Sequence, residues 1–220
     1  MEVNEELKNK VKKFNTFFLV FIFAQFFLMI SSFDVASRFK FLSILFDILG
    51  VFIILGIFLL GLSLFKLRKI NRQFYLSLIT FCLYIAVVTV KDICRTSTDD
   101  FYLIWGNALD WTGRGLLCVL YIYFFIALHN FFLELGFVKD NKGHLALILA
   151  FAVLFFLERL LVFLLFFDGI KFNTLANRIC TYGKMVLTIV IYIYALATSI
   201  VIKVRYHNKI KEVCSNEVLE

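Results

Sequence analysis

Six runs of mostly apolar residues follow one another along the chain, separated by short polar stretches. A helix that crosses a bilayer needs about 20 consecutive apolar residues, so each run predicts one membrane span. The expected spans cover residues 14–30, 43–65, 74–90, 116–135, 145–167 and 184–202. Nothing between them is long enough to fold alone. The pattern therefore predicts an all-α polytopic membrane protein, with one transmembrane domain over residues 1–220.

The loop between the third and fourth expected spans has its own pattern, DDFYLIWGNALDW. Its aromatic residues include Phe101, Trp105 and Trp111, and Trp and Tyr favour the membrane–water boundary. We expect a short interfacial helix here, broken from the fourth span by Gly113 and Gly115. A re-entrant element that lines a cavity is the alternative.

Apolar residues at helical spacing continue beyond the first and last spans. These two terminal stripes consist of Val3, Leu7, Val11 and Phe14 at one end, and of Tyr206, Ile210 and Val213 at the other. Lysines stand between the members of the first stripe. Such a pattern predicts amphipathic helices that lie on the membrane surface, with contact to a partner protein as the alternative.

Composition agrees with a membrane protein. The chain has 220 residues, of which 62% are hydrophobic and 18% charged, and its mean hydropathy is +0.90. Soluble domains are about 45–50% apolar and about 25% charged. A soluble globular protein, a disordered chain and a disulfide-rich secreted module are thereby excluded. Pro is absent, so only Gly is available to interrupt a helix.

Lys and Arg are unevenly divided between the two sides of the expected bundle. Fourteen lie in segments on the side of the N-terminus and eight on the opposite side. Because short cytoplasmic loops carry the excess of positive charge, both termini are expected in the cytoplasm, and the membrane is expected to be the plasma membrane. The net charge of +7 is then explained by topology and lipid contact. We expect no nucleic-acid partner, and the expected partners are the bilayer, a second copy of the chain, or a membrane or cytoplasmic protein.

Two ionisable residues lie within the fifth span, Glu158 and Arg159. A charge at this depth is costly unless it is paired or hydrated. Neighbours on a helix point about 100° apart, so we expect each to meet a group on another helix, with Asp47 and Gln25 as candidate partners. The two interpretations are a polar lock between helices and an ion or substrate site.

Other candidate groups are few. His129 and Asn130 lie near the inner end of the fourth span, but the three His are scattered and no metal-ligand spacing is present, so no metal or cofactor is expected. Cys94 and Cys180 both fall in segments expected outside, where an oxidising environment would allow a disulfide.

Three functions are compatible with this pattern. No known catalytic motif is present, which favours a non-catalytic membrane subunit that acts through oligomerisation or a partner, as a sensor, scaffold or pore-forming effector. Glu158 and Arg159 favour a small transporter or its substrate-binding subunit. The interfacial loop and His129 are the only support for a lipid-modifying enzyme.

Overall fold

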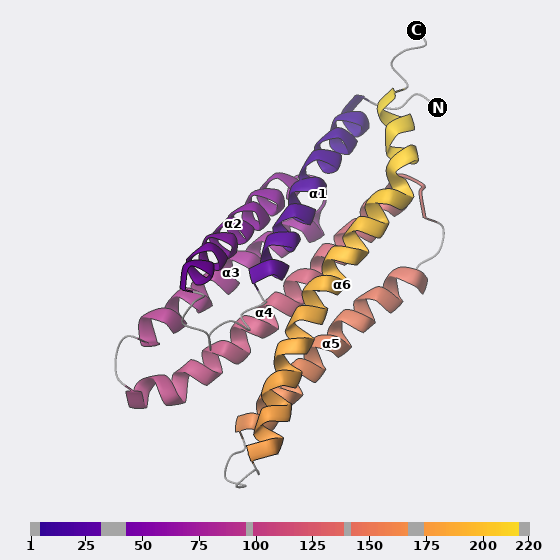
Figure 1. Ribbon diagram of the computed structural model, residues 1–220. Helices are drawn as coiled ribbons and strands as arrows, with labels where there is room; N and C mark the ends of the chain where they lie inside the picture. The colour runs from indigo at the N-terminus through magenta and orange to yellow at the C-terminus, as the bar shows by residue number, and fades with distance from the viewer. Residues whose placement is uncertain (1–4, 32–42, 96–98, 139–141, 167–173, 216–220) are drawn as a thin grey trace. The chain divides into compact units, whose positions relative to one another are not determined.

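The computed structural model describes residues 5–31, 43–95, 99–138, 142–166 and 174–215, and within these ranges the regular structure is entirely α-helical (Figure 1). The described helices are α1 (Glu5–Ser31), α2 (Ser43–Leu67), α3 (Arg72–Arg95), α4 (Asp99–Glu134), α5 (Lys142–Phe166) and α6 (Thr174–Ser215). Within the described residues, α1, α2, α3, α4 and α6 are long and apolar enough to cross a membrane. The all-α prediction is confirmed, and an integral membrane protein is indicated. That α5 also spans, completing six, stays a prediction.

The expected break before the fourth span is wrong. α4 is one helix of 36 residues that contains the DDFYLIWGNALDW segment, Gly113 and Gly115. A single Gly costs a helix only about 1 kcal/mol, which tertiary contacts offset. At Gly113 an added Cβ would lie 3.6 Å from Val87 on α3, which is an ordinary van der Waals distance, so the packing of α3 against α4 does not require Gly here. Within α4, Trp105 and Trp111 are 53% and 39% exposed, whereas the side chain of Phe101 lies outside the described residues.

Several residues of the two terminal stripes are buried against protein. On α1, Val11 and Phe14 are fully buried, and on α6, Tyr206 and Ile210 are 6% and 3% exposed. α1 and α6 pack side by side (Figure 1), so these four residues face protein, whereas contact of the stripes with the membrane surface stays a prediction. Sequence reasoning treated each stripe alone and could not see that the other would cover it.

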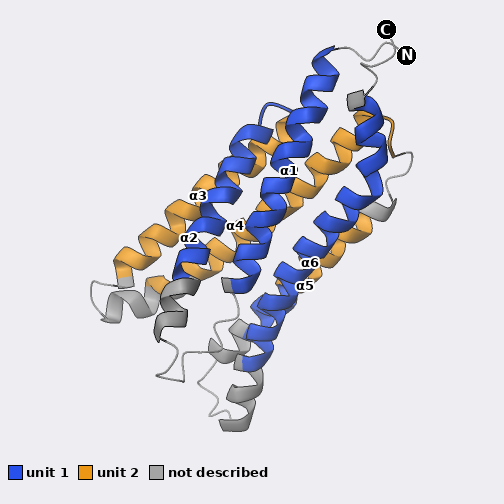
Figure 2. Ribbon diagram, turned by 45° about the horizontal axis from the view of Figure 1, so that its top comes forward, with its two compact units in different colours: residues 1–70, 156–220 blue, residues 71–155 orange. Residues whose placement is uncertain are grey.

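The chain divides into two compact units (Figure 2). Unit 1 comprises residues 1–70 and 156–220, and unit 2 comprises residues 71–155, so the boundary falls within α5. Unit 1 buries aromatic and aliphatic side chains of α1 and α2: Phe14, Phe18, Phe21, Leu60, Leu64 and Leu67. Unit 2 buries an aromatic cluster from α3, α4 and α5: Phe74, Tyr121, Phe124, Phe125, Phe151 and Phe155. Each core is thus built on Phe, which the sequence uses 29 times.

Asn71 fixes the start of α3 in unit 2. Its Oδ1 accepts a hydrogen bond from the backbone N–H of Phe74 at 3.0 Å, which is the usual N-cap geometry. Its Nδ2 donates to the backbone carbonyl of Ala127 on α4 at 2.9 Å. One side chain therefore both caps α3 and ties it to α4.

Gly136 ends α4. Its φ of +68° lies in the left-handed region that Gly adopts without strain. The backbone N–H groups of Gly136 and Phe137 donate to the carbonyls of Leu133 and Phe132, at 3.0 and 2.9 Å. The rings of Phe132 and Phe137 lie 6.2 Å apart, which supplies the apolar contact typical of this type of helix end.

Gly56 allows α1 and α2 to pack closely, and replacing it tests that contact. An added Cβ would lie 2.9 Å from Leu28 Cγ and 3.3 Å from the backbone oxygen of Ala24. Gly56→Leu is therefore expected to lower the free energy of unfolding by about 1 to 2 kcal/mol, measured by denaturant titration in mild detergent. Gly50, also on α2, has no atom within 4 Å of the added Cβ and provides the control, Gly50→Leu. Equal losses in the two variants would contradict a close contact at Gly56.

Candidate functional site

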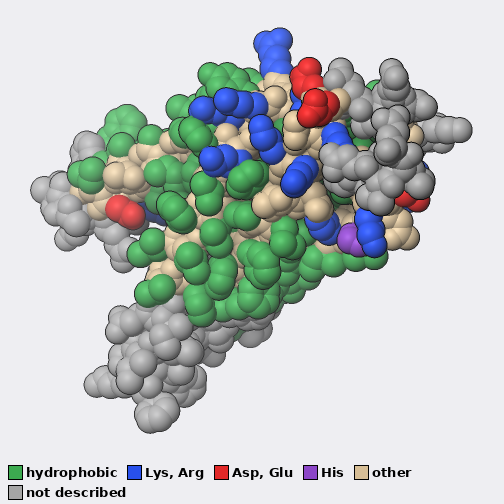
Figure 3. All heavy atoms as spheres, turned by 90° about the horizontal axis from the view of Figure 1, so that it is seen from above, with side chains coloured by type: hydrophobic (Ala, Val, Ile, Leu, Met, Phe, Trp, Pro, Cys, Tyr) green, Lys and Arg blue, Asp and Glu red, His purple; other side chains and the backbone are tan. Residues whose placement is uncertain are grey.

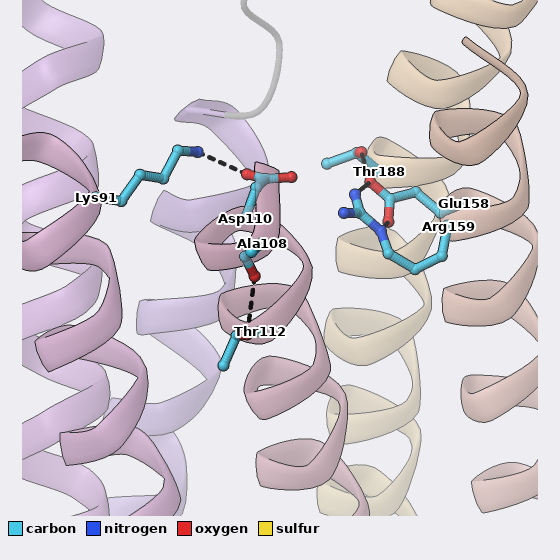
Figure 4. Close-up of polar contacts among 7 residues, drawn as sticks. All are labelled: Lys91, Ala108, Asp110, Thr112, Glu158, Arg159 and Thr188. Atoms are coloured by element: carbon cyan, nitrogen blue, oxygen red, sulfur yellow. Dashed lines mark hydrogen bonds and ion pairs between the residues drawn. The ribbon is translucent and has the colours of Figure 1, made fainter. Parts of the chain in front are cut away.

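Glu158 and Arg159 form a buried ion pair within α5 (Figure 4). Arg159 Nε donates to Glu158 Oε2 at 2.6 Å, and Arg159 Nη2 donates to Oε1 at 2.5 Å. The side chains of Glu158 and Arg159 are 1% and 10% exposed. Paired donors facing both carboxylate oxygens are the strongest geometry open to Arg and a carboxylate.

Sequence spacing did not predict that Glu158 and Arg159 bond each other. Adjacent positions do diverge on a helix, but the long Arg side chain can fold back so that its planar end lies against the neighbouring carboxylate. The two charges then neutralise each other directly, between neighbours in the sequence. As expected, Arg159 faces protein, with 8% of the residue exposed.

Thr188 links the pair to α6, but only weakly. Its Oγ1 lies 3.5 Å from Glu158 Oε1 and 3.0 Å from the backbone carbonyl of Lys184, one turn earlier on α6. A hydroxyl has one proton to donate, so the shorter bond to its own helix is favoured. With both carboxylate oxygens engaged by Arg159, the arrangement is chemically a neutral polar element between α5 and α6.

The proposed partners of Arg159 are not settled. Gln25 on α1 is fully buried, and the side chain of Asp47 lies outside the described residues. Their contact with Arg159 stays a prediction.

The remaining candidates stay separate or untested. His129 and Asn130 are half-buried on α4. No group of three or more His, Cys, Asp or Glu residues that could hold a metal ion occurs in the described part of the chain. The disulfide between Cys94 and Cys180 remains a prediction, because the side chain of Cys180 lies outside the described residues.

Two polar contacts between helices were missed from the sequence. In unit 2, Lys91 of α3 and Asp110 of α4 form an ion pair at 2.6 Å (Figure 4), with about a quarter of each side chain exposed. In unit 1, Lys203 Nζ of α6 donates to the backbone carbonyl of Asn15 on α1 at 3.2 Å, and also to its Oδ1. The charges are visible in the sequence, but a charge near a span end has no assigned partner until helices are paired.

Comparison with known proteins adds no relationship: no protein-family model, no curated protein and no solved structure matches the chain.

Proposed function

We propose that this chain is a non-catalytic, six-span subunit of the plasma membrane, with both ends cytoplasmic, which acts as a sensor or scaffold by contact with another protein. The observation that carries the proposal is the packing of α1 against α6 beyond the expected spans. We name this part the helical projection, consisting of residues 5–13 of α1 and 203–215 of α6.

The length of α6 supports a projection outside the bilayer. With 42 residues at about 1.5 Å each, α6 extends about 63 Å, whereas the hydrocarbon core is about 30 Å thick. If residues 184–202 span the membrane, the last 13 described residues continue for about 20 Å beyond them.

The projection has a packed inner side and a charged outer side. Val11, Tyr206 and Ile210 are buried, and the Lys203–Asn15 contact joins the two helices at its base. Lys209 and Lys211, by contrast, are exposed. A paired, charged helical element outside the membrane suits recognition of a complementary protein surface.

The buried ion pair favours this proposal over the transporter. An ion or substrate site would need a carboxylate or guanidinium available to the solute, whereas Glu158 and Arg159 engage each other through two hydrogen bonds. A polar lock that fixes α5 is the function their geometry supports.

The test is the mass of the tagged chain purified in mild detergent from its own cells. We expect an assembly heavier than the 25.7 kDa monomer. Reversing two charges on the projection, Lys209→Glu with Lys211→Glu, is expected to release the partner. The control reverses two exposed charges outside the projection, Lys66→Glu at the end of α2 with Lys69→Glu in the turn after it, and should leave the assembly intact.

A monomer of 25.7 kDa would contradict the proposal, especially if it moved a solute across proteoliposome membranes. Loss of both assembly and membrane insertion in the projection variant would show only misfolding, so the melting temperature of each variant is measured alongside. A variant that melts as the wild type and keeps its partner places the contact elsewhere and overturns the role of the projection.

A further inference from the structure

A groove of about 700 Å³ lies in unit 1, between the beginning of α1 and the end of α2. We call it the basic groove. It is lined by Glu6, Asn9, Lys10, Lys13, Phe17, Phe65, Lys66, Arg68, Lys69 and Ile70. Sequence reasoning took its lysines as a sign of topology and of general lipid contact, and did not predict that they gather around one groove. Figure 3 looks onto this end of the molecule and shows Lys and Arg side chains gathered there.

The charge of the basic groove is unbalanced. Five of its lining residues are cations and one, Glu6, is an anion. Glu6 is bonded to Lys10 on the same helix at 3.0 Å, and 71% of its side chain is exposed. Like charges brought this close repel one another unless an anion neutralises them. The groove is therefore complementary to a ligand with more than one negative charge.

The cations come from two opposite walls. Lys10 and Lys13 belong to α1, whereas Lys66, Arg68 and Lys69 belong to the end of α2 and the turn after it. Two phosphates held a few ångströms apart would place one against each wall.

The floor of the groove is aromatic. Phe17 and Phe65 lie at the ends of the apolar segments of α1 and α2. Lys66 Nζ lies 6.0 Å from the centre of the Phe17 ring, and the Arg68 guanidinium lies 3.8 Å from the centre of the Phe65 ring. The cations therefore stand where apolar helix surface gives way to water, which is the depth of lipid phosphates in a bilayer.

We propose that the basic groove binds an anionic phospholipid that carries two phosphates, with the phosphates between the two basic walls and the acyl chains along Phe17 and Phe65. The basic groove shares Lys10 and Lys13 with the helical projection, but the proposal concerns the space between α1 and α2 and requires no protein partner. The aromatic floor distinguishes a lipid from free phosphate, which would leave those rings uncovered.

Native mass spectrometry of the full chain in mild detergent tests the proposal. The chain is titrated with cardiolipin, which has two phosphates, with phosphatidylglycerol, which has one, and with inorganic phosphate. We expect cardiolipin to bind at least about tenfold more tightly than phosphatidylglycerol, and inorganic phosphate to leave bound cardiolipin in place. Equal affinity for the two lipids, or displacement by inorganic phosphate at matched concentration, would overturn it.

A groove variant removes three charges: Lys13→Gln, Lys66→Gln and Lys69→Gln together. Each lysine near an anionic surface contributes about 1 kcal/mol, so cardiolipin affinity should fall at least about tenfold. The charge-keeping variant with Arg at the same three positions should retain binding. Loss of binding in the Arg variant would overturn the proposed electrostatic basis.

A matched control removes three exposed charges at the same end outside the groove: Lys12→Gln, Lys209→Gln and Lys211→Gln. We expect its cardiolipin affinity to change by no more than about twofold, because these residues do not line the groove. An equal loss in control and groove variants would mean that lipid responds only to net charge, and the site would be rejected. All three variants should melt as the wild type without added lipid, since the replaced side chains are exposed.

Discussion

Replacing Arg159 with Met should lower the free energy of unfolding by about 3 to 5 kcal/mol. The change keeps much of the side-chain volume but leaves the Glu158 carboxylate, 1% exposed, without its neutralising partner. An uncompensated buried charge is far more costly than the loss of a surface ion pair. Denaturant titration of the purified chain in mild detergent, or in a bilayer mimic, measures the effect.

The matched control is Arg205→Met on α6. Arg205 is exposed, with its guanidinium 5.9 Å from the centre of the Tyr206 ring, so the expected loss is less than about 1 kcal/mol. The double variant Glu158→Leu with Arg159→Met removes both charges and should recover most of the stability lost in Arg159→Met. If the double variant were as unstable as Arg159→Met, the claim that Glu158 and Arg159 neutralise each other's charge would be contradicted.

The ion pair also changes the meaning of a Glu158→Gln exchange. If Glu158 met only neutral groups, Gln would preserve its hydrogen bonds at little cost. Here Gln removes the charge that balances Arg159, so stability should fall even if no ion is ever transported. Loss of activity in Glu158→Gln alone would therefore not identify an ion site. The double variant, Glu158→Gln with Arg159→Gln, keeps the site neutral but removes the titratable carboxylate, so a loss of activity in it cannot be ascribed to an unbalanced charge.

Truncating Phe151 to Ala should cost about 3 kcal/mol. Phe151 is fully buried in unit 2, and its ring centre lies 5.0 Å from that of Tyr121, 5.5 Å from Phe125 and 5.7 Å from Phe155. Removing the ring leaves a cavity among three rigid side chains that cannot collapse to fill it. The cost lies at the low end of the range for soluble proteins, because the unfolded chain in detergent also keeps this ring away from water.

Phe156→Ala provides the comparison on the same helix. Phe156 is 66% exposed, so its truncation should change the free energy of unfolding by less than about 1 kcal/mol. If Phe156→Ala were the more destabilising of the two, the assignment of Phe151 to the core of unit 2 would be wrong.

The positions of the helices could be predicted from the sequence, because an apolar run long enough to cross a membrane is typical of a helix and of few other structures. The expected segments 14–30, 43–65 and 145–167 fall in or close to α1, α2 and α5. Helix ends were harder to predict. α4 continues through Gly113 and Gly115, because a single Gly costs a helix only about 1 kcal/mol and does not by itself end it.

The candidate site was predicted in residues but not in geometry. Charge type and depth were enough to single out Glu158 and Arg159, yet their mutual bond depends on a side-chain conformation that sequence spacing does not determine. The basic groove illustrates a different limit. Its cations come from two segments more than fifty residues apart, and only the packing of α1 against α2 brings Lys13 and Lys66 to one space.

Because α6 is one uninterrupted helix, a tilt near one of its ends displaces residues near the other end. Its 42 residues contain no Pro, and at Gly183, near one end of its described side chains, an added Cβ would lie 3.0 Å from Leu161 of α5. The 27 residues from Gly183 to Ile210 extend about 40 Å, so a tilt of about 5° at Gly183 would displace Ile210 by roughly 3.5 Å. Because α6 is one continuous helix, a small rearrangement beside Gly183 would displace Ile210 by a larger distance near the other end of the helix.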